Sequence, residues 1–201
     1  MTQAAIEFWF DFSSSYAYFA SLEIEDLAAR HGREVLWRPF MLGTAFQVTG
    51  ARGLSSTPLK RDYALHDWRR IARLRGVSFQ LPPHHPSVAV PPMRVFYHLE
   101  RTRPDMAVAF AKAVFAAYYR GGTDTADPEA VKAIGQGLGL DPDDLGRAMA
   151  DPEIKALAKA RSEEAVARGV FGSPWMFVDG EPFWGWDRLP MIDLWLSRGG
   201  W

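Results

Sequence analysis

Apolar residues follow the pattern of strands in two parts of the chain, one near each end. Residues 5–12 are rich in aromatic side chains and predict a buried strand, and residues 34–38 predict a second one. Between them apolar residues recur at helical spacing, at Ala17, Ala20, Ile24, Leu27 and Ala28. This spacing predicts a helix to about His31, which Gly32 ends. The chain therefore opens β-α-β, and a right-handed crossover makes the two strands parallel.

The middle of the chain, from about residue 41 to 168, shows almost no strand pattern. Helices are predicted over residues 58–75, 93–101, 128–138, 142–149 and 151–168, with another that begins at Pro104. An Asp-Pro pair, a typical start signal, stands at the start of the helices predicted over residues 128–138, 142–149 and 151–168. This part of the chain is therefore expected to be all helical.

The strand pattern returns near the end of the chain. Residues 175–178 and 181–184 predict two short strands, and Asp179-Gly180 between them is typical of a two-residue hairpin turn. A last helix is predicted over residues 189–196. The halves β-α-β and β-β-α, separated by helices, predict an α/β thioredoxin-like fold with a large all-helical insertion. We expect a thioredoxin-like domain of residues 1–40 and 169–201, and a helical domain of residues 41–168.

The composition narrows the chemistry. The 201 residues include no cysteine, which excludes a disulfide framework, a thiolate metal site and a cysteine nucleophile. A dithiol oxidoreductase is excluded for the same reason. A net charge of −1 does not favour a nucleic-acid partner, and no pattern suggests a metal site.

Nothing at the start of the chain resembles a targeting segment. The first six residues are not a basic segment followed by an apolar run, and no apolar stretch approaches the roughly 20 residues that span a bilayer. We therefore expect a cytoplasmic protein with no membrane partner.

Three serines, Ser13, Ser14 and Ser15, lie between the first strand and the first helix. The unpaired N–H groups and partial positive charge of a helix N-terminus stabilise an anion placed there. A serine hydroxyl is a poor redox group, but it can donate a hydrogen bond to a thiolate that comes from another molecule. Helix capping explains one serine equally well, and the two interpretations are compatible.

A second turn, Gly169-Val170-Phe171-Gly172-Ser173-Pro174, precedes the third strand. In the thioredoxin architecture this position holds a cis-proline. The backbone of Ser173 would then face the first helix and could pair with a peptide-like ligand, as an added strand does. The alternative is an ordinary turn from loop to strand.

These motifs resemble, in order and over essentially the whole chain, the 2-hydroxychromene-2-carboxylate isomerases and kappa-class glutathione transferases of the DsbA-like group. The segments that carry the resemblance are Phe10-Asp11-Phe12-Ser13-Ser14-Ser15-Tyr16-Ala17-Tyr18, Trp37-Arg38-Pro39-Phe40, Lys60-Arg61-Asp62-Tyr63, the Gly169–Pro174 turn and Phe183-Trp184-Gly185-Trp186-Asp187-Arg188-Leu189. The resemblance implies a glutathione site between a thioredoxin domain and a helical domain, in a homodimer.

The resemblance assigns roles residue by residue. Ser14 matches the serine that faces the glutathione sulfur, and it is the predicted catalytic residue. Lys60 matches a lysine that contacts glutathione. Ser173 matches the residue whose backbone pairs with the cysteinyl part, and Asp187 matches the contact to the γ-glutamyl end. The full predicted glutathione site is Ser14, Ser15, Tyr16, Lys60, Ser173, Pro174, Trp186 and Asp187.

Four positions depart from the family pattern. Ser15 replaces the usual proline, and Ala17 replaces a common serine. Ala51 stands where a ligand-contacting asparagine is frequent, and Trp186 replaces a small or amide residue.

Basic residues and a pair of histidines also occur in the middle of the chain. Residues 52–75 carry an excess of positive charge, which either attracts an anionic ligand or forms a solvated helix face. His84-His85, in a proline-rich stretch, is better explained as a pair of loop histidines than as a metal site.

The leading hypothesis is a glutathione-dependent cis-trans isomerase of an aromatic 2-oxo acid in the catabolism of aromatic compounds. Its nucleophile would be the borrowed thiolate of glutathione. One alternative is a kappa-class-like transferase that leaves glutathione on its product. Another is a non-catalytic DsbA-like binding protein, which the altered residues Ser15, Ala51 and Trp186 motivate.

Overall fold

The first two strands form the parallel pair that the opening pattern predicts. In the structure, a computed structural model that describes residues 4–201, β1 (Ile6–Phe10) pairs with β2 (Val35–Pro39). Strand β3 (Trp175–Val178) lies antiparallel to β1, and β4 (Glu181–Trp184) lies antiparallel to β3. The sheet order is β2-β1-β3-β4. The predicted thioredoxin-like arrangement of strands is confirmed.

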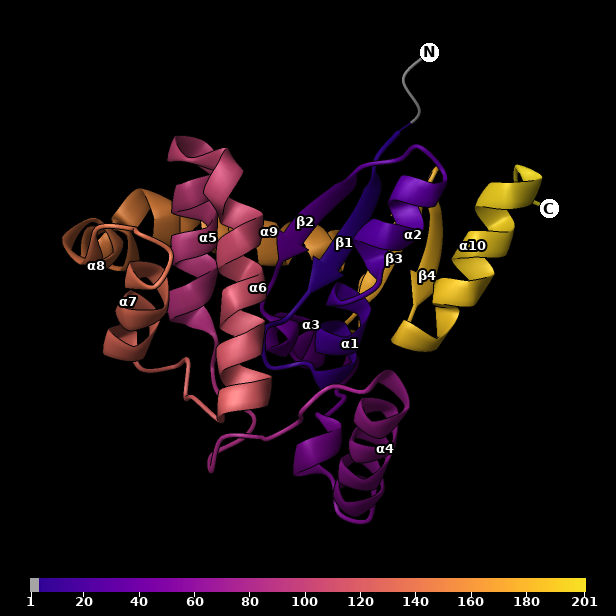
Figure 1. Cartoon of the computed structure of the whole chain (residues 1–201), viewed down its shortest axis with the longest axis horizontal. Coiled ribbons are helices and arrows are strands. Elements are labelled where there is room, and N and C mark those ends of the chain that lie inside the picture. Colours follow the sequence, from indigo (N-terminus) through magenta and orange to yellow (C-terminus); the bar gives the residue numbers. More distant parts are fainter. Residues whose placement is uncertain (1–3) are drawn as a thin grey trace.

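Helices and the loops that join them make up the rest of the described chain, and the helices between β2 and β3 form the predicted insertion (Figure 1). The helices are α1 (Ser15–Ser21), α2 (Ile24–Arg30), α3 (Leu42–Thr49), α4 (Lys60–Arg75), α5 (Val90–Thr102), α6 (Pro104–Gly121), α7 (Pro128–Gln136), α8 (Pro142–Ala150), α9 (Pro152–Ala167) and α10 (Leu189–Arg198), with short 3-10 turns η1 (Leu54–Ser56) and η2 (Trp186–Arg188). The three Asp-Pro signals are confirmed, because Asp127, Asp141 and Asp151 cap α7, α8 and α9 through their side chains.

The two faces of the sheet bury different sets of side chains. Along β1, Phe8 and Phe10 belong to the main core, while Trp9 belongs to a smaller cluster on the opposite face. This is the alternation that a strand imposes on successive residues. The main core continues from Phe10 to Phe115 of α6, whose ring centroids are 5.3 Å apart. The insertion therefore packs directly against the sheet.

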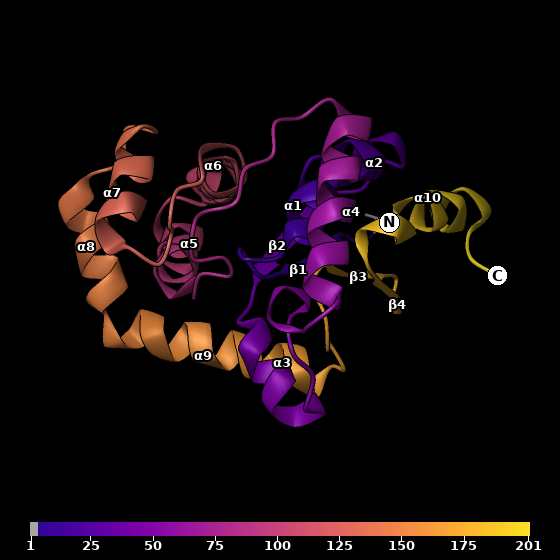
Figure 2. The ribbon, with the colours of Figure 1, turned by 90° about the horizontal axis from the view of Figure 1, so that it is seen from below.

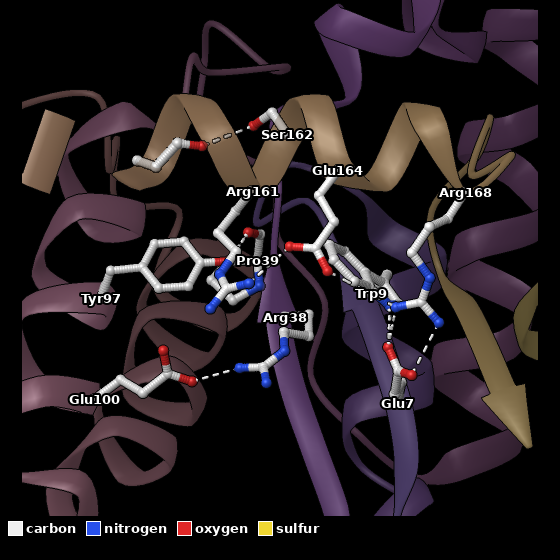
Figure 3. Close-up of polar contacts among 11 residues, drawn as sticks. Glu7, Trp9, Arg38, Pro39, Tyr97, Glu100, Arg161, Ser162, Glu164 and Arg168 are labelled. Carbon is white, nitrogen blue, oxygen red and sulfur yellow. Dashed lines mark hydrogen bonds and ion pairs between the residues drawn. The ribbon is translucent and has the colours of Figure 1, made fainter. Parts of the chain in front are cut away.

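Helix α9 crosses the other face of the sheet and runs from α8 toward α3 (Figure 2). Figure 3 shows how polar contacts hold it there. The Arg168 guanidinium makes two hydrogen bonds of 2.6 and 2.9 Å to the Glu7 carboxylate of β1, and it lies 4.3 Å from the Phe177 ring centroid. A neighbouring contact in the same figure attaches α5 to the sheet instead, since the buried Tyr97 hydroxyl of α5 donates to the Pro39 carbonyl at the end of β2.

The predicted first helix is two helices. The hydroxyl of Ser21 donates to the Tyr18 carbonyl, and the backbone N–H groups of Leu22 and Glu23 bond three residues back rather than four. This tightening ends α1 and starts α2 in a new direction. It turns Glu23 toward tertiary partners that the local pattern does not reveal.

Helix α3 was not predicted. Its segment contains glycine, valine and two threonines, which are weak helix formers. Its first N–H, that of Leu42, donates to the carboxylate of Asp11 at 2.8 Å, and the N–H of Met41 donates to the Ser162 hydroxyl at 3.0 Å. Side chains distant in the sequence therefore satisfy the start of this helix.

The boundaries of the two expected domains stay a prediction, and the first of them includes residues 1–3, which lie outside the described residues. Within residues 4–201, no helix combines the length and the apolar character needed to cross a membrane.

Candidate functional site

Ser14 caps the first helix and bridges two loops. It is the N-cap of α1, and its hydroxyl oxygen accepts from the Ala17 N–H at 3.3 Å. The same hydroxyl donates to the Ser173 carbonyl at 2.8 Å. Ser14 is half-buried, so its hydroxyl stands at the helix N-terminus, where an anion is stabilised.

Ser173 and Pro174 meet Ser14 from the second loop. The Ser173–Pro174 peptide bond is cis, as the motif predicts. The Ser173 hydroxyl accepts from the Asp11 N–H at 2.9 Å. Two hydrogen bonds therefore join the turn before α1 to the turn before β3, and the backbone carbonyl of Ser173 faces the start of α1.

Asp11 organises this turn, and the sequence analysis did not single it out. Asp11 is 4% exposed, and its carboxylate accepts from the Ser13 N–H, the Ser13 hydroxyl and the Leu42 N–H at 2.7–2.8 Å. Burial raises the pKa of this carboxyl group, while the three donors oppose the rise. A polar residue directly after an aromatic strand is the signal that could have identified it.

Ser15 points away from Ser14 into the core. It is 2% exposed, and its hydroxyl lies beside that of the fully buried Tyr119. Among residues 4–201 neither hydroxyl has a partner with hydrogen-bond geometry. Of the Ser15 atoms, only those of the backbone are therefore placed to make the predicted contact with a ligand.

Tyr16 and Lys60 line one pocket, as the prediction of a shared site requires. The pocket has a volume of about 420 Å³ and is lined by Tyr16, Leu54, Leu59, Lys60, Tyr63 and Ala64. The Tyr16 hydroxyl donates to the Asp67 carboxylate at 2.9 Å. Burial, and then the Asp67 carboxylate, raise the pKa of Tyr16, so its ring stays a neutral phenol.

Leu59 holds a strained backbone at the edge of this pocket. Its φ is 64° and its ψ is −44°, and the Lys60 N–H donates back to the Pro58 carbonyl at 2.8 Å. This is a γ-turn with positive φ, a rare conformation for a residue with a side chain. Leu59 is also 89% exposed. Strain of this kind gathers at ligand-binding sites.

Trp186 and Asp187 lie next to the Ser173–Pro174 loop, because the Gly185 N–H donates to the Pro174 carbonyl at 3.1 Å. The Asp187 side chain is exposed beside Arg188. The indole of Trp186 instead donates to Glu23 at 3.0 Å. Asp187 therefore faces solvent, while Trp186 contacts Glu23 at the break between α1 and α2.

His85 is a loop histidine, as predicted, but it is not a free one. Its Nε2 lies 2.9 Å from the Ser55 hydroxyl, and its Nδ1 lies 2.9 Å from the Tyr118 hydroxyl. Its ring packs edge-on against Trp68. Burial, with the nearby Arg61 charge, lowers the pKa of His85 to about 4.

His85→Gln is expected to remove a pH-dependent part of the stability. The folded pKa lies below the unfolded value of about 6.5, so the unfolded chain binds the extra proton. The stabilisation is complete above about pH 6.5 and is lost as the pH falls toward 4. The difference in unfolding free energy between wild type and variant should shrink by at most about 1.4 kcal/mol per pH unit. Urea titrations at several pH values measure it, and a difference that does not change with pH contradicts the assignment.

The comparison with known families agrees with this geometry. The family model of the DsbA-like thioredoxin domain matches residues 5–196. The chain therefore belongs to the DsbA-like thioredoxin family.

The relatives give the group within that family. A 2-hydroxychromene-2-carboxylate isomerase of Sphingobium xenophagum is 31% identical over 193 residues, which cover 95% of this chain and 97% of the relative. Glutathione s-transferase kappa 2 of Caenorhabditis elegans is 24% identical, over 96% of this chain and 92% of the relative. A solved structure of 2-hydroxychromene-2-carboxylate isomerase superposes with a TM-score of 0.87 at 25% identity, over 96% of this chain and 95% of that one. Within the DsbA-like family the chain falls among these isomerases and kappa-class transferases, as its motifs indicate.

Proposed function

We propose that this protein is a glutathione-dependent cis-trans isomerase of an aromatic 2-oxo acid, similar to 2-hydroxychromene-2-carboxylate isomerase and active in aromatic catabolism. One observation carries the proposal: the helix N-terminus that favours an anion presents the Ser14 hydroxyl in a chain without cysteine. A thiolate from another molecule would complete such a site.

The residues present fit a thiol tripeptide. The Ser14 hydroxyl and the first N–H groups of α1 offer donors to a sulfur anion. The Ser173 carbonyl offers an acceptor to a peptide N–H. The Asp187 carboxylate is exposed and could pair with an amino group, while Lys60 lines the pocket and could pair with a carboxylate.

When bound, glutathione supplies a thiolate that adds to a conjugated carbon, lets the former double bond rotate, and leaves again. The chain's own contribution is a change in the acceptor to which the Ser14 hydroxyl donates. In the structure Ser14 donates to the Ser173 carbonyl. If a peptide N–H takes that acceptor, the Ser14 proton is released to turn toward the sulfur. Ser14 then stabilises the anion, and Ser173 orients the peptide that carries it.

The positive charge near the pocket supports an anionic substrate. Arg61 follows Lys60 in the first turn of α4, and both side chains are exposed. A glutathione thiolate and an aromatic 2-oxo acid are both anionic, so these charges raise their local concentration. The aromatic substrate, the homodimer and the cytoplasmic location stay predictions.

A transferase is the second candidate, because one relative is named a kappa-class transferase. An assay with chlorodinitrobenzene and glutathione separates the two activities. Conjugation without isomerisation of aromatic 2-oxo acids favours the transferase. Glutathione binding without either reaction favours a non-catalytic binding protein.

Titration of the purified protein with reduced glutathione in a calorimeter is expected to show saturable binding at one site per chain. Oxidised glutathione, which has no free thiol, is the matched control and should bind more weakly. An absence of binding at millimolar glutathione would overturn the proposed function.

A further inference from the structure

Three side chains from separate segments form a continuous hydrogen-bonded row beside the pocket. Ser55 lies in η1, His85 in the loop before α5, and Tyr118 near the end of α6. The distances are 2.9 Å from the Ser55 hydroxyl to His85 Nε2 and 2.9 Å from His85 Nδ1 to the Tyr118 hydroxyl. The proposed function does not use this row.

The direction of the hydrogen bonds in this row follows from Tyr118, which forms its buried end. The backbone N–H of Ser87 can only donate, and it donates to the Tyr118 oxygen at 3.0 Å. Tyr118 is 0% exposed, and the acceptor with hydrogen-bond geometry toward its hydroxyl is His85 Nδ1, whereas the nearby Ser87 hydroxyl lacks that geometry. We therefore assign the Tyr118 proton to His85 Nδ1. A neutral imidazole that accepts at Nδ1 carries its proton on Nε2. Nε2 then donates to the Ser55 oxygen.

Ser55 is consequently a hydrogen-bond donor. Its oxygen already accepts from His85, so its own hydrogen is directed to another partner. This polarity is the reverse of a nucleophilic serine, in which histidine accepts the hydroxyl proton. The low pKa of His85 keeps the imidazole neutral at physiological pH and preserves the direction of the row.

The position of Ser55 indicates its partner. Leu54, the preceding residue of η1, lines the same pocket as Lys60 and Tyr16. The Lys60 ammonium group in this pocket, with the Ser55 hydroxyl one residue beyond the lining residue Leu54, suits a carboxylate, which accepts several hydrogen bonds. With the sulfur at Ser14 and the γ-glutamyl end toward Asp187, the opposite end of the tripeptide is the glycyl carboxylate.

We propose that Ser55 donates its hydroxyl hydrogen to the glycyl carboxylate of glutathione, with His85 and Tyr118 as positioning residues. This inference rests on the proposed function, because it requires glutathione at Ser14.

A calorimetric cycle of two proteins and two ligands tests it. Ser55→Ala is expected to raise the Kd for glutathione about 10- to 100-fold, as for the loss of a hydrogen bond to a charged group. Glutathione glycyl ethyl ester, whose glycyl carboxylate is blocked, should bind wild type and Ser55→Ala equally. Ser56→Ala, at the exposed neighbour in η1, is the matched control and should bind glutathione as wild type does. Ser55→Thr keeps the hydroxyl and should restore binding.

The outcomes separate the two proposals. If wild type does not bind glutathione, the proposed function fails, and this inference fails with it. If wild type binds and Ser55→Ala binds equally well, only the inference is overturned. An equal loss with glutathione and with its ester also overturns it, since Ser55 would then act on the pocket's shape.

The positioning role has its own readout, independent of activity. In the free protein, ¹⁵N NMR of the imidazole should show the neutral Nε2–H form of His85. Tyr118→Phe should convert it to a mixture of tautomers and weaken glutathione binding. Tyr97→Phe, which removes a buried hydroxyl that donates to the Pro39 carbonyl, is the control for the loss of a tyrosine hydroxyl elsewhere. An Nδ1–H form in wild type would overturn the assigned direction.

Discussion

Replacing Ser14 with alanine is expected to lower glutathione-dependent turnover about 100-fold, the usual cost of removing one donor from a stabilised anion. The physical reason is that the Ser14 hydroxyl stands at the N-terminus of α1, next to the Ser173 carbonyl that would hold the peptide. Steady-state kinetics with a 2-hydroxychromene-2-carboxylate substrate measures the effect, and thermal unfolding shows whether the fold is kept.

A second variant distinguishes this role from helix capping. Aspartate caps a helix as well as serine does, but it places a negative charge beside the sulfur. Ser14→Asp keeps the cap of α1 but loses the hydrogen bond that serine donates to the Ser173 carbonyl. It is therefore expected to be no less stable than Ser14→Ala and less active. If Ser14→Asp keeps wild-type turnover, capping alone explains the serine and the mechanism is wrong.

Replacing Asp11 with alanine is expected to lower the free energy of unfolding by about 3 kcal/mol, because two partly buried backbone donors lose their acceptor. These are the N–H groups of Ser13 and Leu42, at the two turns that frame the site. Burial raises the pKa of Asp11, which means that the buried carboxylate charge itself costs stability at neutral pH. Removing this charge therefore offsets part of the loss from the two unpaired N–H groups. Urea unfolding measures the net effect.

Ser13→Ala is the matched control for Asp11. It removes one donor to the same carboxylate and leaves both backbone N–H groups paired. The expected loss is about 1 kcal/mol. Equal stability of Asp11→Ala and Ser13→Ala would show that the carboxylate does not hold the two turns together.

Most elements of the fold could be predicted because their signals are local. The aromatic run that forms β1, the Asp179-Gly180 hairpin and the three Asp-Pro caps each depend on residues within a few positions of one another. The turn at Asp179-Gly180 has positive φ at both residues, 53° and 90°, as this pair favours.

The elements that were missed depend on distant partners. Helix α3 begins where Asp11 and Ser162 accept its first N–H groups, and neither is near it in the sequence. At the break between α1 and α2, the Glu23 carboxylate accepts from the Trp186 indole and forms an ion pair of 2.9 Å with Arg75. No local pattern contains these contacts.

The sequence by itself determined the family, the thioredoxin-like succession of strands and the presence of serines instead of cysteine in the turn before α1, because motifs and a missing residue type are visible along one dimension. Only the tertiary structure decided which of the three serines faces the other loop. It turned Ser15 into the core and paired Ser14 with Ser173. It also made His85 a neutral positioning candidate, because hydrogen-bond direction and burial depend on Tyr118 and Ser55, which only folding brings to the same place.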